Sequence, residues 1–173
     1  MTNRAISLIK ADHKKVKTLF DEFEQAKGRA AKKKIIASAL LELKIHAALE
    51  EEIFYAAVRR KVGKEIMNEA DEEHHVAKVL IAELEAMEGG EDHYDAKFTV
   101  LSENVRHHIK EEEGEMLPEV QEMKLDFDAL AEQMLARREE LLANGFPPVG
   151  EESMVAAVGE KGDSPAQAAR KTR

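Results

Sequence analysis

The chain has 173 residues, of which 43% are hydrophobic and 35% charged, and it contains no cysteine. That length fits roughly one domain with a short extension, and the lack of cysteine excludes disulfide frameworks, Cys-ligated zinc, iron–sulfur clusters and thiol catalysis. A net charge of −9, with six Phe, two Tyr and no Trp, argues against nucleic-acid binding. Because the chain has neither a long apolar stretch nor a signal-peptide core, we expect a cytoplasmic protein that does not bind membranes.

Apolar residues recur at spacings of three and four along most of the chain, which is typical of amphipathic helices. Gly28, Gly63 and the Gly89-Gly90 pair interrupt the pattern as helix C-terminal breaks do, and Pro118 fits the first turn of a later helix. The sequence predicts five helices, at residues 3–26, 30–61, 64–87, 93–115 and 119–143.

Short connections between these helices favour antiparallel neighbours. The predicted fold is therefore all-α, an up-down-up-down four-helix bundle with an additional C-terminal helix. We expect residues 1–118 to form the bundle and residues 119–145 an additional packing helix. Residues 146–173 are rich in Pro, Gly, Ala and Ser, a composition that predicts a flexible, disordered tail.

The histidines follow an internal repeat. Residues 12–23 line up with residues 73–84, and residues 46–56 line up with residues 108–118. The matching motifs are Asp12-His13 with Glu73-His74, and His46-xxx-Glu50-Glu51 with His108-xxx-Glu112-Glu113. The chain is thus predicted to hold two copies of one helical hairpin.

This alignment chooses between neighbouring histidines. Taking His75 instead of His74, or His107 instead of His108, would put a polar residue where the other copy has an apolar one. We therefore expect His74 and His108 to face the core. His75, His93 and His107 are expected at surface or flanking positions.

The four core-facing histidines are predicted to lie in one layer. His13 precedes Gly28 by 15 residues and His46 follows it by 18, and His74 and His108 flank the Gly89-Gly90 pair in the same way. Since each helical residue rises about 1.5 Å, groups nearly equidistant from a turn lie at nearly the same height. A glutamate four residues after a histidine lies on the same helix face, so two carboxylates join the layer.

Such a cluster predicts a metal centre. Burying imidazoles and carboxylates without partners is costly, and the two ligand types together suit iron, manganese or zinc. The predicted ligands are His13, His46, Glu50, His74, His108 and Glu112. Two cations about 3–4 Å apart, joined by an oxo or hydroxo bridge, would keep about one open position each. The alternative is that no metal binds, the histidines are hydrogen-bonded in the core and the glutamates face solvent. A ferritin-like site needs two Glu-x-x-His pairs, and Glu72/His75 is the only one in the sequence.

Over residues 5–118 these motifs resemble the haemerythrin-like family, also called the HHE cation-binding domain. The resemblance implies a four-helix bundle with a non-haem di-iron centre held by the six residues above. Oxygen-carrying haemerythrins have an HxxxH pair on the third helix, whereas Lys78 follows His74 by four residues here. Simple oxygen transport is therefore a poor match, and the centre is expected to be more open to external ligands.

The leading functional hypothesis is a di-iron protein that binds dioxygen, nitric oxide or peroxide in sensing or stress defence. Manganese or zinc could replace the two iron ions. One alternative is an enzyme that turns over peroxide or nitric oxide, or an iron donor for iron–sulfur cluster repair, with Tyr55 and Lys78 close behind the ligands. The other is a metal-free helical interaction module. The sequence names no protein partner.

Overall fold

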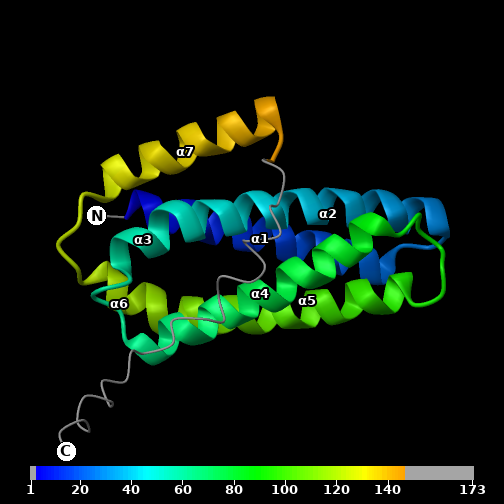
Figure 1. Ribbon diagram of the computed structural model, residues 1–173, viewed down its shortest axis with the longest axis horizontal. Helices are drawn as coiled ribbons and strands as arrows, with labels where there is room; N and C mark the ends of the chain where they lie inside the picture. Colours follow the sequence, from blue (N-terminus) through cyan, green and yellow to red (C-terminus); the bar gives the residue numbers. More distant parts are fainter. Residues whose placement is uncertain (1–2, 147–173) are drawn as a thin grey trace, which may run out of the picture.

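The computed structural model describes residues 3–146, and this part of the chain is all-helical. Four antiparallel helical segments run along the long axis, and a further helix lies outside them (Figure 1). Two of the four segments contain a short π-helical stretch, labelled η. The elements are α1 (Arg4–Gln25), α2 (Arg29–Leu49), η1 (Glu50–Phe54), α3 (Tyr55–Val58), α4 (Lys64–Ala86), α5 (Tyr94–Glu111), η2 (Glu112–Met116), α6 (Leu117–Gln121) and α7 (Phe127–Asn144). The predicted bundle with an additional C-terminal helix is confirmed.

The two hairpin turns meet at one end of the bundle. The Arg29 side chain donates a hydrogen bond of 2.9 Å from Nε to the Gly89 carbonyl oxygen. A Cβ on Gly90 would lie 1.7 Å from Arg29 Nε, and Gly90 has a φ of +89°. The positive φ favours glycine at this position, because glycine adopts it without strain. The Arg29 hydrogen bond joins the turn of the α1–α2 hairpin to the turn of the α4–α5 hairpin.

The core consists of two apolar clusters. One lies near the paired turns and includes Phe20, Ile36 and Phe98. The other lies toward α3 and α6 and includes Leu49 and Leu117. Between them the inward positions of α1, α2, α4 and α5 carry histidine, so a polar layer crosses the bundle midway.

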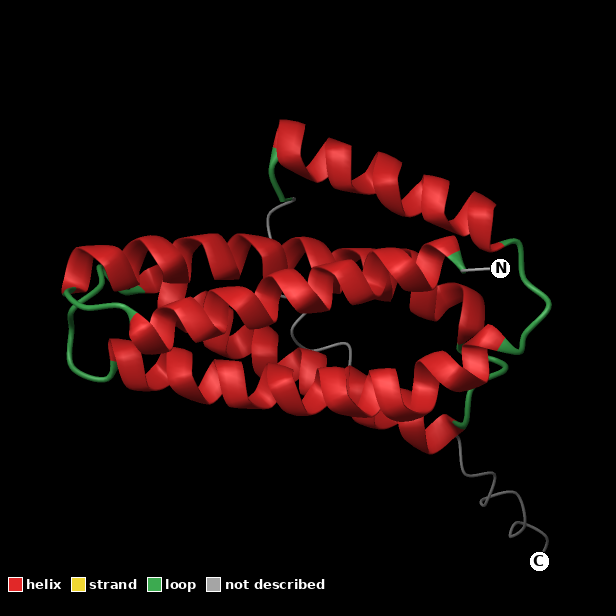
Figure 2. Cartoon of the chain, turned by 180° about the vertical axis from the view of Figure 1, so that it is seen from behind, coloured by secondary structure: helices red, strands yellow, loops and turns green. Residues whose placement is uncertain are grey.

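Helix α7 packs along α1 and α2 and leaves α4 and α5 uncovered (Figure 1, Figure 2). Its inward face contributes Ala131 and Met134 to the apolar cluster near α3. The side chain of Asp126 accepts a hydrogen bond of 3.0 Å from the Ala129 amide and so caps the start of the helix. An aspartate at this position satisfies one of the free amides of the first helical turn.

The bounds predicted for the last two helices were wrong. The helix predicted to end at residue 115 continues through η2 and α6 to Gln121, and the helix predicted to begin at residue 119 begins at Phe127. Pro118 is the second residue of α6, which follows η2 without a break, so it does not separate two helices. The break falls instead at residues 122–126, before the Asp126 cap.

Other expectations stay predictions. The tail predicted from residue 146 lies, from residue 147 on, outside the described residues. No helix within residues 3–146 is long and apolar enough to cross a bilayer. The division into segments at residues 118 and 145 also stays a prediction, as does the compartment.

Candidate metal centre

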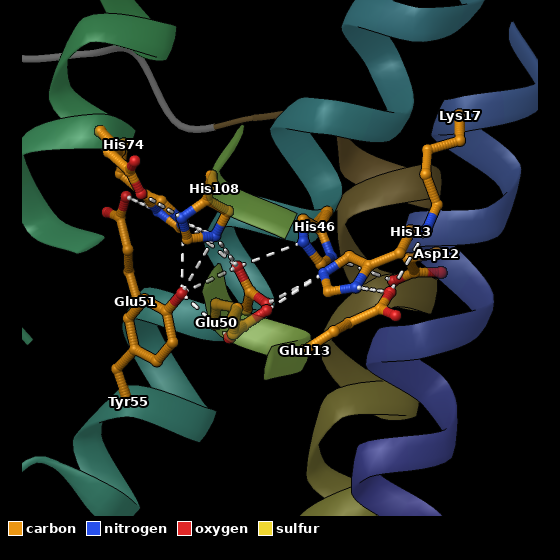
Figure 3. Close-up of polar contacts among 12 residues, drawn as sticks. Asp12, His13, Lys17, His46, Glu50, Glu51, Tyr55, His74, His108 and Glu113 are labelled. Atoms are coloured by element: carbon orange, nitrogen blue, oxygen red, sulfur yellow. Dashed lines mark hydrogen bonds and ion pairs between the residues drawn. The ribbon is translucent and has the colours of Figure 1, made fainter. Parts of the chain in front are cut away.

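Six side chains meet in the polar layer between the two apolar clusters. His13 comes from α1, His74 from α4 and Glu50 from the start of η1. His46 lies on α2 and His108 on α5, each one turn before a glutamate. All six predicted ligands are at least nine-tenths buried, and His13 and Glu50 are fully buried. Figure 3 shows His13 and His46 on one side of Glu50, with His74 and His108 on the other.

The ligand atoms form two groups that share Glu50. One group is His13, His46 and Glu50, and the other is Glu50, His74 and His108. Within each group the candidate atoms lie within 4.8 Å of one another. Glu50 Oε2 is 3.2 Å from the Nε2 atoms of both His46 and His74. Its carboxylate therefore lies between the two pairs of imidazoles.

Glu112 also reaches both sides of the layer. Its Oε2 is 3.1 Å from His13 Nε2, and its Oε1 accepts a hydrogen bond of 3.1 Å from the Tyr55 hydroxyl. Glu50 and Glu112 thus occupy equivalent positions in the two hairpins. Each can bridge a pair of cations held by the surrounding imidazoles.

The two π-helical stretches begin at these glutamates and keep the residues that follow them on the inward face. Four residues turn an α-helix about 40° too far to return to the same face, so a run of inward residues spaced by four drifts around the helix. The wider π turn cancels that drift. Buried residues spaced by four are His46, Glu50, Phe54 and Val58 in one hairpin, and His108, Glu112, Met116 and Val120 in the other. This spacing was visible in the sequence, but the prediction missed the π stretches.

A carboxylate lies next to the Nδ1 atom of each imidazole. The Nδ1 atoms of His13, His74 and His108 lie 2.8–2.9 Å from Glu113, Glu51 and Glu73 respectively. His46 Nδ1 lies 3.5 Å from Asp12. Because a carboxylate only accepts, Nδ1 carries the proton in the three hydrogen bonds. Nε2 then faces the interior, which is the orientation that metal-bound histidines have.

The prediction gave these four carboxylates no role in the centre, although they belong to the repeated motifs. In each copy an acid precedes the first histidine, and a second glutamate follows the inward one. The preceding acids, Asp12 and Glu73, serve the other histidine of their own hairpin. The following glutamates, Glu51 and Glu113, serve the opposite hairpin. The repeat therefore encodes the support of the imidazoles as well as the imidazoles themselves.

The structure places Tyr55 and Lys78 at different depths. The Tyr55 hydroxyl is buried, 3.4 Å from the Nε2 atoms of His74 and His108. Lys78 Nζ lies 2.9 Å from the Glu51 carboxylate, so it contacts the layer only through the partner of His74. The phenol touches the predicted ligands directly, whereas the ammonium acts one residue further out.

Neighbouring charges and burial shift the pKa values of several side chains in the layer. Burial lowers the pKa of His74, but Glu50 and Glu51 outweigh burial and raise it to about 10. Burial raises the pKa of Glu50, but the charges of His46, His74 and His108 hold it well below its usual range. Burial and the two central glutamates raise the pKa of Tyr55 well above its usual value, so the phenol stays protonated. A cation that binds here displaces protons from the imidazoles.

Several buried atoms in the layer have no hydrogen-bond partner within residues 3–146. Besides His46 Nδ1, they are His13 Nε2, His46 Nε2, Glu50 Oε1 and Glu112 Oε2. Buried polar atoms without partners are rare because each costs roughly 1–3 kcal/mol. Cations coordinated by nitrogen and oxygen satisfy all four at once, so the residues fit a metal centre of the predicted kind.

A small apolar cavity adjoins the layer. It has a volume of about 30 Å³, and its walls include His46, His74 and His108 together with Leu43 and Val105. A cavity needs about 10–15 Å³ to hold one water molecule. The space is therefore large enough for a molecule of a few atoms.

The histidines predicted to lie away from the centre do so. His93 and His107 are exposed, and His75 is half-buried. His107 nevertheless joins a third group of candidate ligand atoms, with Glu69 and Glu111 on the surface of α4 and α5. The prediction did not expect this group.

An all-α bundle crossed by a buried His/Glu layer defines a class of helical metal-binding proteins. The hemerythrin HHE cation binding domain matches residues 4–120, and the chain belongs to this family. Family and side-chain clusters together indicate that the protein binds a metal cation.

One curated relative is described as a DNA nickase, from Nostoc sp. (strain PCC 7120). It is 27% identical over 107 residues, which is 62% of this chain but 30% of that protein. The chain thus spans less than a third of the relative it matches. No solved structure matches the chain.

Proposed function

We propose that the chain is a non-haem di-iron protein whose centre binds dioxygen, nitric oxide or peroxide in sensing or stress defence. The observation that carries the proposal is the position of Glu50, a fully buried carboxylate shared by two groups of candidate ligands. One cation would have no need of a second pair of imidazoles. Two iron ions, when bound, supply redox chemistry toward small oxygen and nitrogen ligands.

The chain's own residues set the conditions for that chemistry. Glu50 and Glu112 join the two positions, and the four imidazoles hold them from the sides. The outer carboxylates fix the orientation of the imidazole rings. The cavity of about 30 Å³ is large enough for a molecule of a few atoms. Its walls expose His46, His74 and His108, so a ligand that enters lies beside the second ligand group.

Metal content tests the proposal. Protein purified without a His tag should contain about two iron ions per chain, and its near-ultraviolet spectrum should change reversibly with dioxygen or nitric oxide. His74→Ala should lower the iron content, whereas His75→Ala, one residue away, should leave it unchanged. Two manganese or zinc ions would overturn the choice of iron. Folded protein without transition metal would favour the metal-free interaction module instead.

Tyr55 supports the enzymatic alternative, turnover of peroxide or nitric oxide. Its hydroxyl donates to Glu112 and lies 3.4 Å from two imidazoles, so it can donate a hydrogen bond to a peroxide or nitric oxide bound beside them. Under this alternative the iron-loaded protein consumes hydrogen peroxide catalytically, and Tyr55→Phe slows consumption several-fold at unchanged iron content. Binding without consumption favours the sensor.

The nicking activity in the relative's description does not support a second proposal. The match covers only 30% of that protein, and a net charge of −9 repels a DNA backbone. Incubation of the loaded protein with supercoiled plasmid checks this. We expect no nicked product above the level of a metal-free control.

A further inference from the structure

Three of the four outer carboxylates are neutralised by a basic side chain, and one is not. Glu113 lies 3.5 Å from Lys17, Glu51 lies 2.9 Å from Lys78, and Asp12 pairs with Arg138. Glu73, which supports His108, has no Lys or Arg partner within residues 3–146. It lies instead 3.5 Å from the exposed imidazole of His107. The corner of the layer between α4 and α5 is therefore the one without a basic side chain behind it.

Outside this corner lies the third group of candidate ligand atoms. Glu69 on α4 and His107 and Glu111 on α5 offer one atom each within 4.8 Å of one another. His107 Nε2 is 3.2 Å from Glu111, which follows it by four residues. The pair thus repeats on the surface the HxxxE spacing of the buried centre. A mixed set of one imidazole and carboxylates suits divalent iron, manganese and zinc.

A pocket connects this surface group with the buried layer. Its outer wall includes Glu69 and Glu111, and its inner wall includes His108 and Glu112. Glu73 lines the same pocket and touches both levels, at 2.8 Å from His108 Nδ1 and 3.5 Å from His107 Nε2. Glu112 is 2% exposed, so the inner end of the pocket is formed by a carboxylate of the buried layer.

We propose that Glu69, His107 and Glu111 form a surface site for a divalent transition-metal ion, and that this site passes the ion through the acidic pocket to the buried centre. The transfer step rests on the proposed function, but the surface site does not. Exposed ligands hold an ion weakly because water screens their charge. Weak binding suits a site that must release its ion inward, where six buried ligands hold it more tightly.

Zinc binding tests the surface site by itself. In the full chain carrying His13→Ala and His74→Ala, each group of buried ligands lacks one member. Calorimetry should still detect one weakly bound Zn²⁺. Adding His107→Gln should weaken that binding at least about tenfold, whereas His75→Gln should not. Absence of the weak site, or binding that survives His107→Gln, overturns the proposal.

This result stands apart from the proposed function, which fails through the metal content of the wild-type protein. Circular dichroism shows whether the double variant is folded. If it is not, the same titration on wild-type chains with a filled centre should count one further Zn²⁺, again lost in His107→Gln. An unchanged count there overturns the surface site.

The rate of iron loading tests the transfer. Metal-free protein is mixed anaerobically with Fe²⁺, and a chelator stops uptake at set times. Glu69→Gln/Glu111→Gln should slow loading about tenfold at low salt, with a smaller effect at high salt and the same final iron content. Glu72→Gln/Glu103→Gln removes the same charge from exposed positions on the same two helices. Equal slowing in both pairs, no slowing, or a lower final content in the first pair overturns the transfer.

Discussion

The two hairpins contribute equivalent histidines, inward glutamates and outer carboxylates to the centre. They differ in the residues that surround the outer carboxylates. In the first half, α7 covers the helices, and its Arg138 pairs with Asp12 behind His46. In the second half, no helix within residues 3–146 covers α4 and α5, and Glu73 faces an acidic pocket. The repeated sequence therefore sets the candidate ligands and their outer carboxylates, and the unrepeated parts determine which side of the layer another helix covers.

A second difference lies at the ends of the π stretches. Tyr55 begins α3 and Leu117 begins α6 at the matching position of the repeat. The Tyr55 hydroxyl lies beside His74 and His108, so the second half holds a proton donor that the first half lacks. The uncovered half thus combines the cavity, the acidic pocket and the phenol. We expect external ligands to react there.

Glu50→Gln should have the largest effect because Glu50 belongs to both halves. An amide at this position removes the charge that both groups share, and we expect nearly all iron to be lost rather than half of it. Elemental analysis of the purified variant measures this, with Glu42→Gln as the matched control, because Glu42 is half-buried on α2 and contacts Lys15 rather than the layer. Retention of about one ion per chain would show that the halves bind independently and would contradict a shared ligand.

Metal removal should destabilise the second half of the centre more than the first. Ions present at about 1,000 times their dissociation constant add about 4 kcal/mol per site, so chelation should lower Tm by roughly 10 °C or more. Amide hydrogen exchange should rise more in α4 and α5 than in α1 and α2, because α7 packs mainly on α1, α2 and η1. Equal exchange in both hairpins would contradict the difference in cover.

Glu51→Gln and Glu113→Gln test the symmetric part of the comparison. Each glutamate accepts from an imidazole of the opposite hairpin at 2.9 Å, and losing such support costs about 10–100-fold in metal affinity. We expect the two variants to lose a similar factor in competition with a chromogenic chelator. If one variant loses much metal affinity and the other loses none, the two outer carboxylates are not functionally equivalent, and the repeat does not extend to them.

The sequence predicted the bundle and the convergence of six side chains because both follow from spacing. A helix has a fixed rise and turn, so the distances of His13, His46, His74 and His108 from the glycine turns determined their common layer. The repeat also chose correctly between the adjacent histidines at positions 74 and 75 and at positions 107 and 108. Their assignment as ligands of two iron ions stays a prediction.

What the sequence reasoning missed depends on contacts between elements. The π stretches change the turn of the helix locally, and the prediction assumed a regular one. Pro118 reads as a helix start in the sequence, but only the structure shows that the helix is continuous on both sides of it. The surface group needs Glu69 on α4 to meet His107 on α5, and no spacing within one helix reports such a contact.

Arg138→Met should have the smallest effect on metal binding. It tests whether α7 contributes to the centre through the contact between Arg138 and Asp12. The Arg138 guanidinium pairs with Asp12, whose pKa burial raises but His46 and Arg138 together hold below its usual value. Losing a hydrogen bond to this charged group costs about 2 kcal/mol, measured as a shift in the urea midpoint. Because Asp12 itself remains beside His46, iron release to a chelator should accelerate by less than about tenfold.

Arg137→Met is the matched control, because Arg137 is the adjacent residue on α7 but pairs with the more exposed Glu52. Exposed ion pairs of this kind contribute little, so neither the urea midpoint nor iron release should change measurably. If both variants behave alike, α7 supports the first half only by covering it. If Arg138→Met alone accelerates iron release, the helix outside the repeat also holds His46 in place through Asp12, and the two halves differ in their chemistry as well as in their access.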